Sequence, residues 1–141
     1  MKILDIIIKK KSDAKSLSRR VGDFGENAAT KYLSKNGYKI LERNYVARGK
    51  EIDIIAQNKE FIVFCEVKSR KTNENFIKKY GRPRDAVNKE KQLHISSAAR
   101  YYLSKNKITK RIRFDVIEVY LENQKENKIK DIIHTKDAFR V

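Results

Sequence analysis

The chain has 141 residues, of which 40% are hydrophobic and 37% are charged. This length suits one domain with a substantial core, and the hydrophobic fraction excludes a chain that is disordered throughout. Thirty-four Lys and Arg against eighteen Asp and Glu give a net charge of +16. Such an excess favours a polyanionic partner such as nucleic acid, although a lysine-rich, solvated surface has the same composition.

Apolar spacing and turn residues predict two helices and five strands along the chain. In chain order they are a helix at 18–36, strands at 38–44, 51–57 and 61–70, a loop at 71–84, a helix at 85–105, a strand at 112–121 and a last short strand within 128–139. Gly37 occupies the cap position of the first helix, and Gly49 lies in the first turn. Residues 58–60 predict a tight hairpin.

This order, αβββαβ with an extra strand, predicts an α/β fold. The strands at 51–57 and 61–70 are apolar on both faces through their middles. Strands of this kind belong to a central sheet that helices cover on both faces.

The amino-terminal segment and the single cysteine bear on domain organisation and location. Residues 1–17 contain a short apolar patch that Asp5 interrupts, without the length or cleavage site of a signal peptide. We expect a basic extension at 1–17, either a short strand or a disordered arm, ahead of one domain at 18–141. Cys65 lies in an apolar run and predicts a buried, reduced thiol. These features, with no stretch able to span a bilayer, favour a cytoplasmic protein without a membrane partner.

Two neighbouring strands of the predicted sheet carry acidic residues. Because strand side chains alternate, Glu51 and Asp53 share one face, and Glu66 and Lys68 share one face of the next strand. The short hairpin permits Asp53 and Glu66 to lie side by side, where carboxylates repel unless a cation or proton lies between them. The cluster therefore predicts a site for Mg²⁺ or Mn²⁺. A structural salt-bridge ladder is the alternative.

Two further residues fit a catalytic interpretation of this cluster. Lys68 is placed to orient an attacking water or to stabilise charge on a phosphorus centre. Glu26 lies at the border of the apolar arc of the first helix, and Gly22 and Gly25 permit close backbone approach there. Glu26 is therefore predicted to reach the acidic end of the sheet. Each residue alone has an ordinary structural explanation, and the combination favours a catalytic site.

The spacing Asp-x₁₂-Glu-x-Lys resembles that of the PD-(D/E)xK nuclease superfamily. A closer resemblance, over about residues 19–120, is to the YraN family of small bacterial proteins. It rests on the runs GENAATKYLSKNGYKILERNY, EIDIIA, VFCEVKSR, YGRPRDAV, KQ and FDVI. The resemblance implies a restriction-endonuclease-like αβββαβ core with a mixed sheet, similar to that of archaeal Holliday junction resolvases. It also implies an Mg²⁺- or Mn²⁺-dependent endonuclease on DNA, branched or structured DNA included, and makes a homodimer a candidate assembly.

Carried over residue by residue, the resemblance names a catalytic set of Glu26, Asp53, Glu66 and Lys68. Asp53 and Glu66 would be the principal metal ligands, with the Val67 carbonyl assisting. Glu26 would bind a metal through water or a second ion. The family usually has Gly directly before the acid at position 51, whereas this chain has Lys50, with Gly49 before it.

Further residues are candidates for accessory and substrate-binding roles. Glu51 and Gln92 are candidates for accessory roles near the acids, and Asp115 is expected to cap or to pair with an arginine. Basic residues flank the Glu-x-Lys strand, where a phosphate backbone would track, although solvated loop charge is the alternative. They are Arg70, Lys71, Lys78, Lys79, Arg82, Arg84, Lys89 and Lys91.

Two functional hypotheses of different class therefore stay open. The first is a metal-dependent endonuclease. The second is a non-catalytic nucleic-acid-binding protein that retains the nuclease fold. Cutting that requires Asp53 distinguishes the first, and salt-sensitive binding that is indifferent to Asp53→Asn distinguishes the second.

Overall fold

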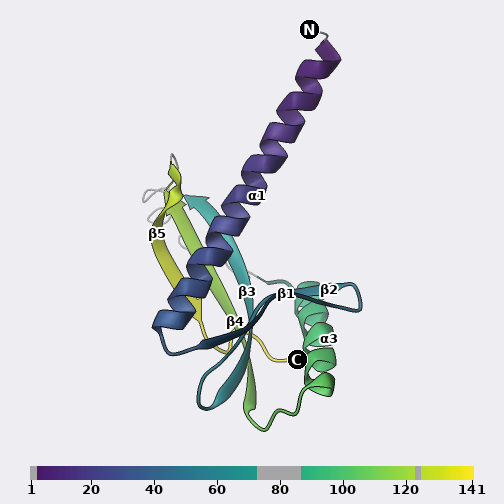
Figure 1. Ribbon diagram of the computed structural model, residues 1–141, viewed down its shortest axis with the longest axis vertical. Helices are drawn as coiled ribbons and strands as arrows, with labels where there is room; N and C mark the ends of the chain where they lie inside the picture. Colours follow the sequence, from purple (N-terminus) through teal and green to yellow (C-terminus); the bar gives the residue numbers. More distant parts are fainter. Residues whose placement is uncertain (1–2, 73–86, 123–124) are drawn as a thin grey trace.

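A computed structural model describes residues 3–72, 87–122 and 125–141, with the side chains of 19–71, 87–122 and 128–141. The elements of these residues are the helices α1 (Ile3–Lys35) and α3 (Lys89–Lys105) and the strands β1 (Lys39–Ala47), β2 (Lys50–Gln57), β3 (Phe61–Thr72), β4 (Arg111–Glu122) and β5 (Lys125–Thr135) (Figure 1). None of the helices described is long and apolar enough to cross a bilayer.

The strands form one five-stranded sheet in the order β1-β2-β3-β4-β5. Every neighbouring pair is antiparallel except β3 and β4, which are parallel. A parallel pair needs a crossover connection, and α3 lies in the connection between β3 and β4. The predicted α/β fold is therefore confirmed: the sheet is mixed, and the arrangement is that of a restriction-endonuclease-like core.

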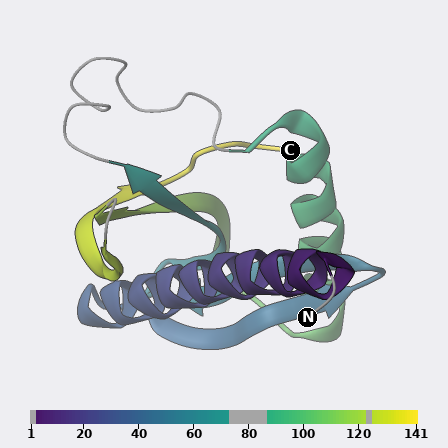
Figure 2. The same ribbon diagram turned by 90° about the horizontal axis from the view of Figure 1, so that it is seen from above.

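Each face of the sheet carries a core of buried apolar side chains. The cluster on the α1 face includes Ala29, Leu33, Ile54, Val63 and Ile117, and the cluster on the α3 face includes Ile52, Phe64, Ile95, Ala98 and Tyr102. Cys65 is fully buried, as predicted, and this burial raises the pKa of its thiol. Figure 2 shows α1 and α3 running in different directions over the sheet.

The connections account for where the elements begin and end. Gly37 has φ of +87° and ends α1, as its cap position predicted. Arg48 and Gly49 both have positive φ (53° and 74°), which is the two-residue turn that suits a tight hairpin between β1 and β2. The hairpin at 58–60 is closed by the Asn58 side chain, which accepts bonds from the N–H groups of Glu60 and Phe61.

Several element boundaries differ from the sequence-based expectation, including the end of β1 at Ala47 and the end of β3 at Thr72. Residues 3–17 continue α1 instead of forming a strand or a disordered arm, and this end of the helix projects beyond the sheet (Figure 1). No Gly or Pro precedes Gly22, so nothing in the local sequence ends the helix. Helix α3 begins at Lys89 because Asn88 caps it, accepting the Lys91 N–H at 2.9 Å. Strand β5 extends over Lys125–Thr135.

Candidate active site

Strands β2 and β3 separate at the point where their acidic residues lie. Their pairing runs from Gln57 opposite Ile62 to Ile54 opposite Cys65 and stops there, although both strands continue. The next step of the same register places Asp53 opposite Glu66. The Val67 N–H, just beyond the last paired residue, donates to Asp53 Oδ2 at 2.8 Å. The Asp53 side chain thus takes the place of the missing ladder partner.

Glu66 is a buried carboxylate with two lysines against one of its oxygens. Its residue is 5% exposed. Lys68 Nζ lies 3.6 Å and Lys91 Nζ 3.7 Å from Oε1. Burial, followed by the charge of Asp53, raises the pKa of Glu66, and the two lysines oppose that shift. Oε2 is buried and accepts no hydrogen bond from the described residues.

Glu26 reaches this region from α1 and meets Glu51 through a shared amide. With the Asn44 nitrogen turned toward the acids, it donates to Glu26 Oε1 at 2.9 Å and to Glu51 Oε1 at 3.1 Å; hydrogen-bonding partners assign this orientation. Asn44 has φ of +51°, a left-handed conformation that Asn tolerates better than most residues. Burial and the charge of Asp53 raise the pKa of Glu26 to about 7.

A close helix–strand contact fixes the approach of Glu26. A Cβ on Gly25 would lie 2.9 Å from Ser69 Cβ on β3, closer than packed carbon atoms come. The prediction of close approach at Gly25 is therefore confirmed. The same prediction for Gly22 is wrong for the described residues, none of which lies within 4 Å of a Cβ built there.

A pocket of about 460 Å³ connects these groups. Its polar lining consists of Arg19, Asp23, Glu26, Asn44, Glu51, Asp53, Lys68 and Ser69. The structure therefore brings Glu26, Glu51, Asp53 and Lys68 to one cavity, with Glu66 beside Asp53. A hydrolytic site for an anionic substrate needs this combination of clustered carboxylates and lysine at an open pocket.

Residues 25–119 match the sequence model of the uncharacterised protein family UPF0102. The chain belongs to the UPF0102 family. This is the YraN family that the sequence motifs resemble. A UPF0102 protein of Clostridium acetobutylicum is 45% identical over 126 residues, covering 89% of this chain and 98% of the relative. One from Acetivibrio thermocellus is 44% identical over 128 residues, covering 89% and 95%. One from Clostridioides difficile is 45% identical over 113 residues, covering 79% and 95%.

Lys50, at which this UPF0102 chain departs from the usual motif, does not displace the neighbouring acid Glu51. Lys50, where the motif has Gly, is the first residue of β2 and pairs with Ala47. The left-handed turn residue is Gly49. Glu51 consequently still reaches Asn44.

Several expected site residues lie apart from the acids of this UPF0102 protein. The Gln92 side chain donates to the Val87 carbonyl at 3.0 Å, at the start of α3, and its accessory role stays a prediction. Arg70 Nε lies 3.8 Å from Glu118 Oε2. Lys71 and Lys89 are exposed on β3 and α3. The remaining predicted phosphate contacts lie outside the described residues: Lys78, Lys79, Arg82 and Arg84.

Sequence reasoning missed two residues of this site. It assigned no role to Asn44, which bridges Glu26 and Glu51. It named Lys91 as a substrate-binding residue, which stays a prediction, and did not foresee that Lys91 lies against Glu66. The one available signal for Asn44 is its residue type, because Asn is enriched at positive φ. Nothing in the sequence indicates that Lys91 on α3 contacts Glu66 on β3, because the two residues belong to elements that a long segment separates along the chain.

The carboxylate oxygens of the UPF0102 site are the type of ligand that a hard divalent cation prefers. Asp53 and Glu66 supply carboxylate oxygens, and the buried Glu66 Oε2 accepts no hydrogen bond from the residues that the structure describes. Across the described ranges, no group of three or more His, Cys, Asp or Glu side chains is arranged to hold a metal ion. The oxygen donors of Asp53 and Glu66 suit Mg²⁺ or Mn²⁺ in chemistry, whereas their arrangement among the described residues falls short of a three-ligand site.

Proposed function

We propose that this UPF0102 protein is a metal-dependent endonuclease that hydrolyses phosphodiester bonds in DNA. The observation that carries the proposal is the position of Asp53 beside Glu66, where β2 and β3 separate. Two carboxylates in this position repel each other, and the Lys68 and Lys91 ammonium groups at 3.6 and 3.7 Å from Glu66 Oε1 offset part of that repulsion. The pKa of Glu66 is raised nonetheless, and clustered acids and bases with shifted pKa values are typical of functional sites.

The ligands proposed for Mg²⁺ or Mn²⁺ are Asp53, Glu66 and the Val67 carbonyl, with Glu26 contributed by α1. When bound, the cation supplies positive charge that polarises the phosphate and offsets the charge of the transition state. The Val67 N–H orients Asp53 by its 2.8 Å bond. The Asn44 amide holds Glu26 and Glu51 together. The chain thus orients its acids through bonds from the backbone and from a neutral side chain.

Lys68 is the residue proposed to meet the substrate phosphate. It lines the pocket, and its ammonium lies 3.6 Å from Glu66. In hydrolysis a water oxygen bonds to phosphorus, one phosphorus–oxygen ester bond breaks, and the leaving oxygen takes a proton. Lys68 would offset the negative charge that develops on the phosphate during this exchange. Lys91, against the same Glu66 oxygen as Lys68, would favour the ionised carboxylate.

Cleavage of a DNA panel tests the proposal. The panel contains linear duplex, single-stranded, flap and four-way junction DNA, each with Mg²⁺, with Mn²⁺ and with chelator. We expect metal-dependent products that Asp53→Asn and Glu66→Gln abolish. Both variants keep side-chain volume, and a circular dichroism spectrum equal to that of the unmodified protein serves as the control. If no DNA in the panel is cut with either metal, the proposal is wrong.

The second candidate function is nucleic-acid binding without catalysis. It is favoured by the lack, in the described part of the chain, of a preassembled group of three metal-binding side chains. The net charge of +16 serves binding as well as cutting. In that case Asp53→Asn leaves DNA affinity and its salt dependence unchanged, and no metal alters the DNA.

A further inference from the structure

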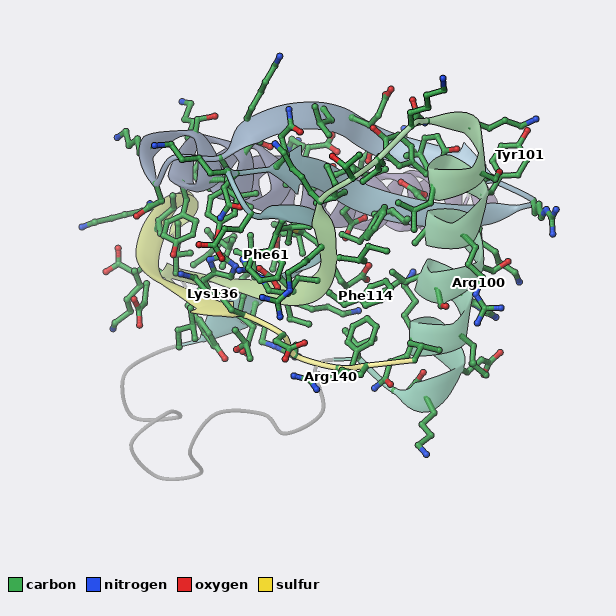
Figure 3. All side chains as sticks on the ribbon, turned by 90° about the horizontal axis from the view of Figure 1, so that it is seen from below. Phe61, Arg100, Tyr101, Phe114, Lys136 and Arg140 are labelled. Carbon is green, nitrogen blue, oxygen red and sulfur yellow. The ribbon has the colours of Figure 1, made fainter. Side chains whose placement is uncertain are left out.

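A pocket of about 230 Å³ lies against the outer side of α3, at the turn that joins β1 to β2. Its lining includes Arg48 from the turn and Ser97, Arg100 and Tyr101 from α3. Figure 3 shows Tyr101 beside the β1–β2 hairpin and Arg100 on the side of α3 that faces away from the sheet. None of the described residues that line the pocket is acidic. The pocket therefore combines hydrogen-bond donors with positive charge.

The Tyr101 ring holds two cations beside this pocket. The Arg48 guanidinium carbon lies 5.7 Å and the Lys105 Nζ lies 5.4 Å from the ring centroid, within the range at which an aromatic ring attracts a cation. Tyr101 is half-buried and packs against the apolar core on the α3 face of the sheet, which fixes its ring. Arg48 and Lys105 are thus held at one ring, and Arg100 is the chain neighbour of that tyrosine.

The described residues do not neutralise these three cations. Arg48, Arg100 and Lys105 are exposed, and none of them forms an ion pair within the described ranges. Glu90, the acid in the first turn of α3, pairs with His94 at 3.9 Å and lies ten residues before Arg100, about 15 Å along the helix. Like charges gathered without a counter-charge repel each other, and a bound anion relieves that repulsion.

The turn that carries Arg48 favours other residue types at this position. Arg48 has φ of +53° and is the first of the two turn residues, where Asn, Asp and Gly are usual. An arginine has no side-chain group that stabilises this left-handed conformation, whereas the short polar side chain of Asn does. Strain of this kind at an exposed residue directs attention to its side chain. The contribution of Arg48 is therefore the position of its guanidinium over Tyr101.

We propose that Arg48 and Arg100 bind a phosphate of a nucleic-acid backbone, with Lys105 adding charge beside them. A guanidinium donates paired hydrogen bonds to phosphate oxygens, and the Ser97 hydroxyl in the same pocket supplies a further donor. The Tyr101 ring serves to hold the cations. The inference rests on the proposed nuclease function and deepens it, because it names a part of the protein that holds the substrate away from the acids.

The spacing along β2 sets where on the substrate this contact falls. Arg48 precedes Asp53 by five residues, which corresponds to about 17 Å along a strand. One strand of duplex DNA carries a phosphate about every 3.4 Å of its axis, so this distance corresponds to about five base steps. The phosphate bound at Arg48 and Arg100 is therefore not the one that is hydrolysed.

Binding of linear duplex DNA in the presence of chelator tests the proposal separately from cutting. All proteins carry Asp53→Asn, which removes a proposed metal ligand and leaves the pocket on α3 intact. The double variant Arg48→Asn/Arg100→Gln is compared with Lys31→Gln/Lys35→Gln, which removes the same charge from exposed positions of α1. Fluorescence anisotropy with two labelled duplexes of different sequence gives Kd over a range of salt concentrations.

We expect the arginine pair to weaken binding about tenfold and to lower the log–log salt slope by about 0.9 per lost contact. The lysine pair should weaken binding less than about twofold. The loss in the arginine pair should be the same for both duplexes, since phosphate contacts carry no sequence information. A loss confined to one sequence would overturn the proposal, and so would equal losses in the two double variants, which would indicate diffuse charge alone.

Arg48→Asn alone separates binding from the structure of the turn. Asn adopts a positive φ more readily, so the urea midpoint of unfolding should rise while the affinity for duplex falls. A raised midpoint with unchanged affinity would show that Arg48 does not contact the nucleic acid, and it would overturn the proposal. A loss of affinity together with a lowered midpoint would indicate a disturbed turn and would also overturn it.

Inorganic phosphate, added at constant ionic strength, distinguishes a backbone phosphate from a free one. We expect it to leave duplex binding unchanged; displacement that the arginine pair abolishes would make the pocket a site for free phosphate and overturn the proposal. The nuclease function is judged separately, in proteins with Asp53 intact. Metal-dependent cutting with no difference between the two double variants would refute this contact alone, whereas arginine-dependent binding without any cutting would refute the nuclease alone.

Discussion

Asp53 Oδ2 accepts a hydrogen bond of 2.8 Å from the backbone N–H of Val67, the residue between Glu66 and Lys68. The carboxylate of β2 is therefore oriented by the backbone of β3, just beyond the last paired residues of the two strands. One bond holds together the three residues of the Glu-x-Lys motif and the acid of the neighbouring strand. The geometry of the acidic pair depends on this bond rather than on strand pairing.

Asp53→Asn and Asp53→Ala should separate the structural role of this bond from the proposed catalytic role. Asn keeps an oxygen that accepts from Val67 and loses the charge that repels Glu66, so we expect a melting temperature equal to or above that of the unmodified protein. Ala leaves the N–H of Val67 without its partner and should cost about 1–2 kcal/mol in unfolding free energy. Thermal and urea unfolding measure both. Equal unfolding free energies of Asp53→Asn and Asp53→Ala would show that the bond from the Val67 N–H does not stabilise the fold.

Lys91 and Glu66 should be energetically coupled, since Lys91 Nζ lies 3.7 Å from Glu66 Oε1. A double-mutant cycle with Lys91→Met and Glu66→Gln, measured by urea unfolding, should give a coupling energy of about 0.5–1 kcal/mol, limited by the exposure of the lysine. Lys89→Met provides the matched control on the same helix, because the exposed Lys89 has no ion pair with Glu66 in the described structure. Coupling of the control as large as that of Lys91 would refute the contact.

Gly25→Ala and Gly22→Ala should have opposite effects on stability, although both residues lie in α1. A Cβ at position 25 would meet Ser69 and push α1 from β3, which should cost about 1–3 kcal/mol. A Cβ at position 22 meets none of the described residues within 4 Å, and the better helix former should add about 0.5–1 kcal/mol.

Ser69→Gly in the Gly25→Ala background should recover part of the lost stability by removing the overlapping side chain. Urea unfolding curves of the unmodified protein, Gly22→Ala, Gly25→Ala and Gly25→Ala/Ser69→Gly provide the comparison. If Gly25→Ala is as stable as Gly22→Ala, α1 does not lie as close to β3 as the structure places it.

Acid stability should depend on Asp115, a fully buried carboxylate on β4. Burial alone would raise its pKa, but hydrogen bonds from His134 at 2.6 Å and Arg113 at 2.8 Å outweigh it, so that the pKa lies below the usual 3.8. The unfolded carboxyl group therefore binds protons more readily than the folded one. The resulting stabilisation is complete above the unfolded pKa and is lost as pH falls through the folded pKa.

Asp115→Asn should consequently flatten the fall in stability below about pH 4. At neutral pH it should cost about 3–5 kcal/mol, because Arg113 keeps a buried charge without its carboxylate. Urea unfolding between neutral and acidic pH measures both effects. Tyr38→Phe is the control: it removes the 2.7 Å bond between Arg113 and the Tyr38 hydroxyl and keeps the carboxylate, so its acid dependence should match that of the unmodified protein. A steep acid dependence in Asp115→Asn would contradict the assignment.

Most of the sheet was predictable because strand and turn preferences act over a few residues. The hairpin at 58–60 and the alternation along β2 and β3 follow from local dihedral limits, and they bring Asp53 opposite Glu66. The prediction was poorer where a local signal was missing. No glycine or proline marked the start of α1, and the short strand expected near the carboxyl terminus is the full-length β5.

The sequence by itself determined the order of the elements and the membership of the family, since each depends on periodicity, turn residues or motifs along the chain. Only the tertiary structure decided which distant residues meet. Lys91 reaches Glu66 because the crossover places α3 over β1 and β2, next to β3, and His134 reaches Asp115 because β5 pairs with β4. Such contacts depend on how strands separate and how helices cross a sheet, which the packing of the whole domain sets.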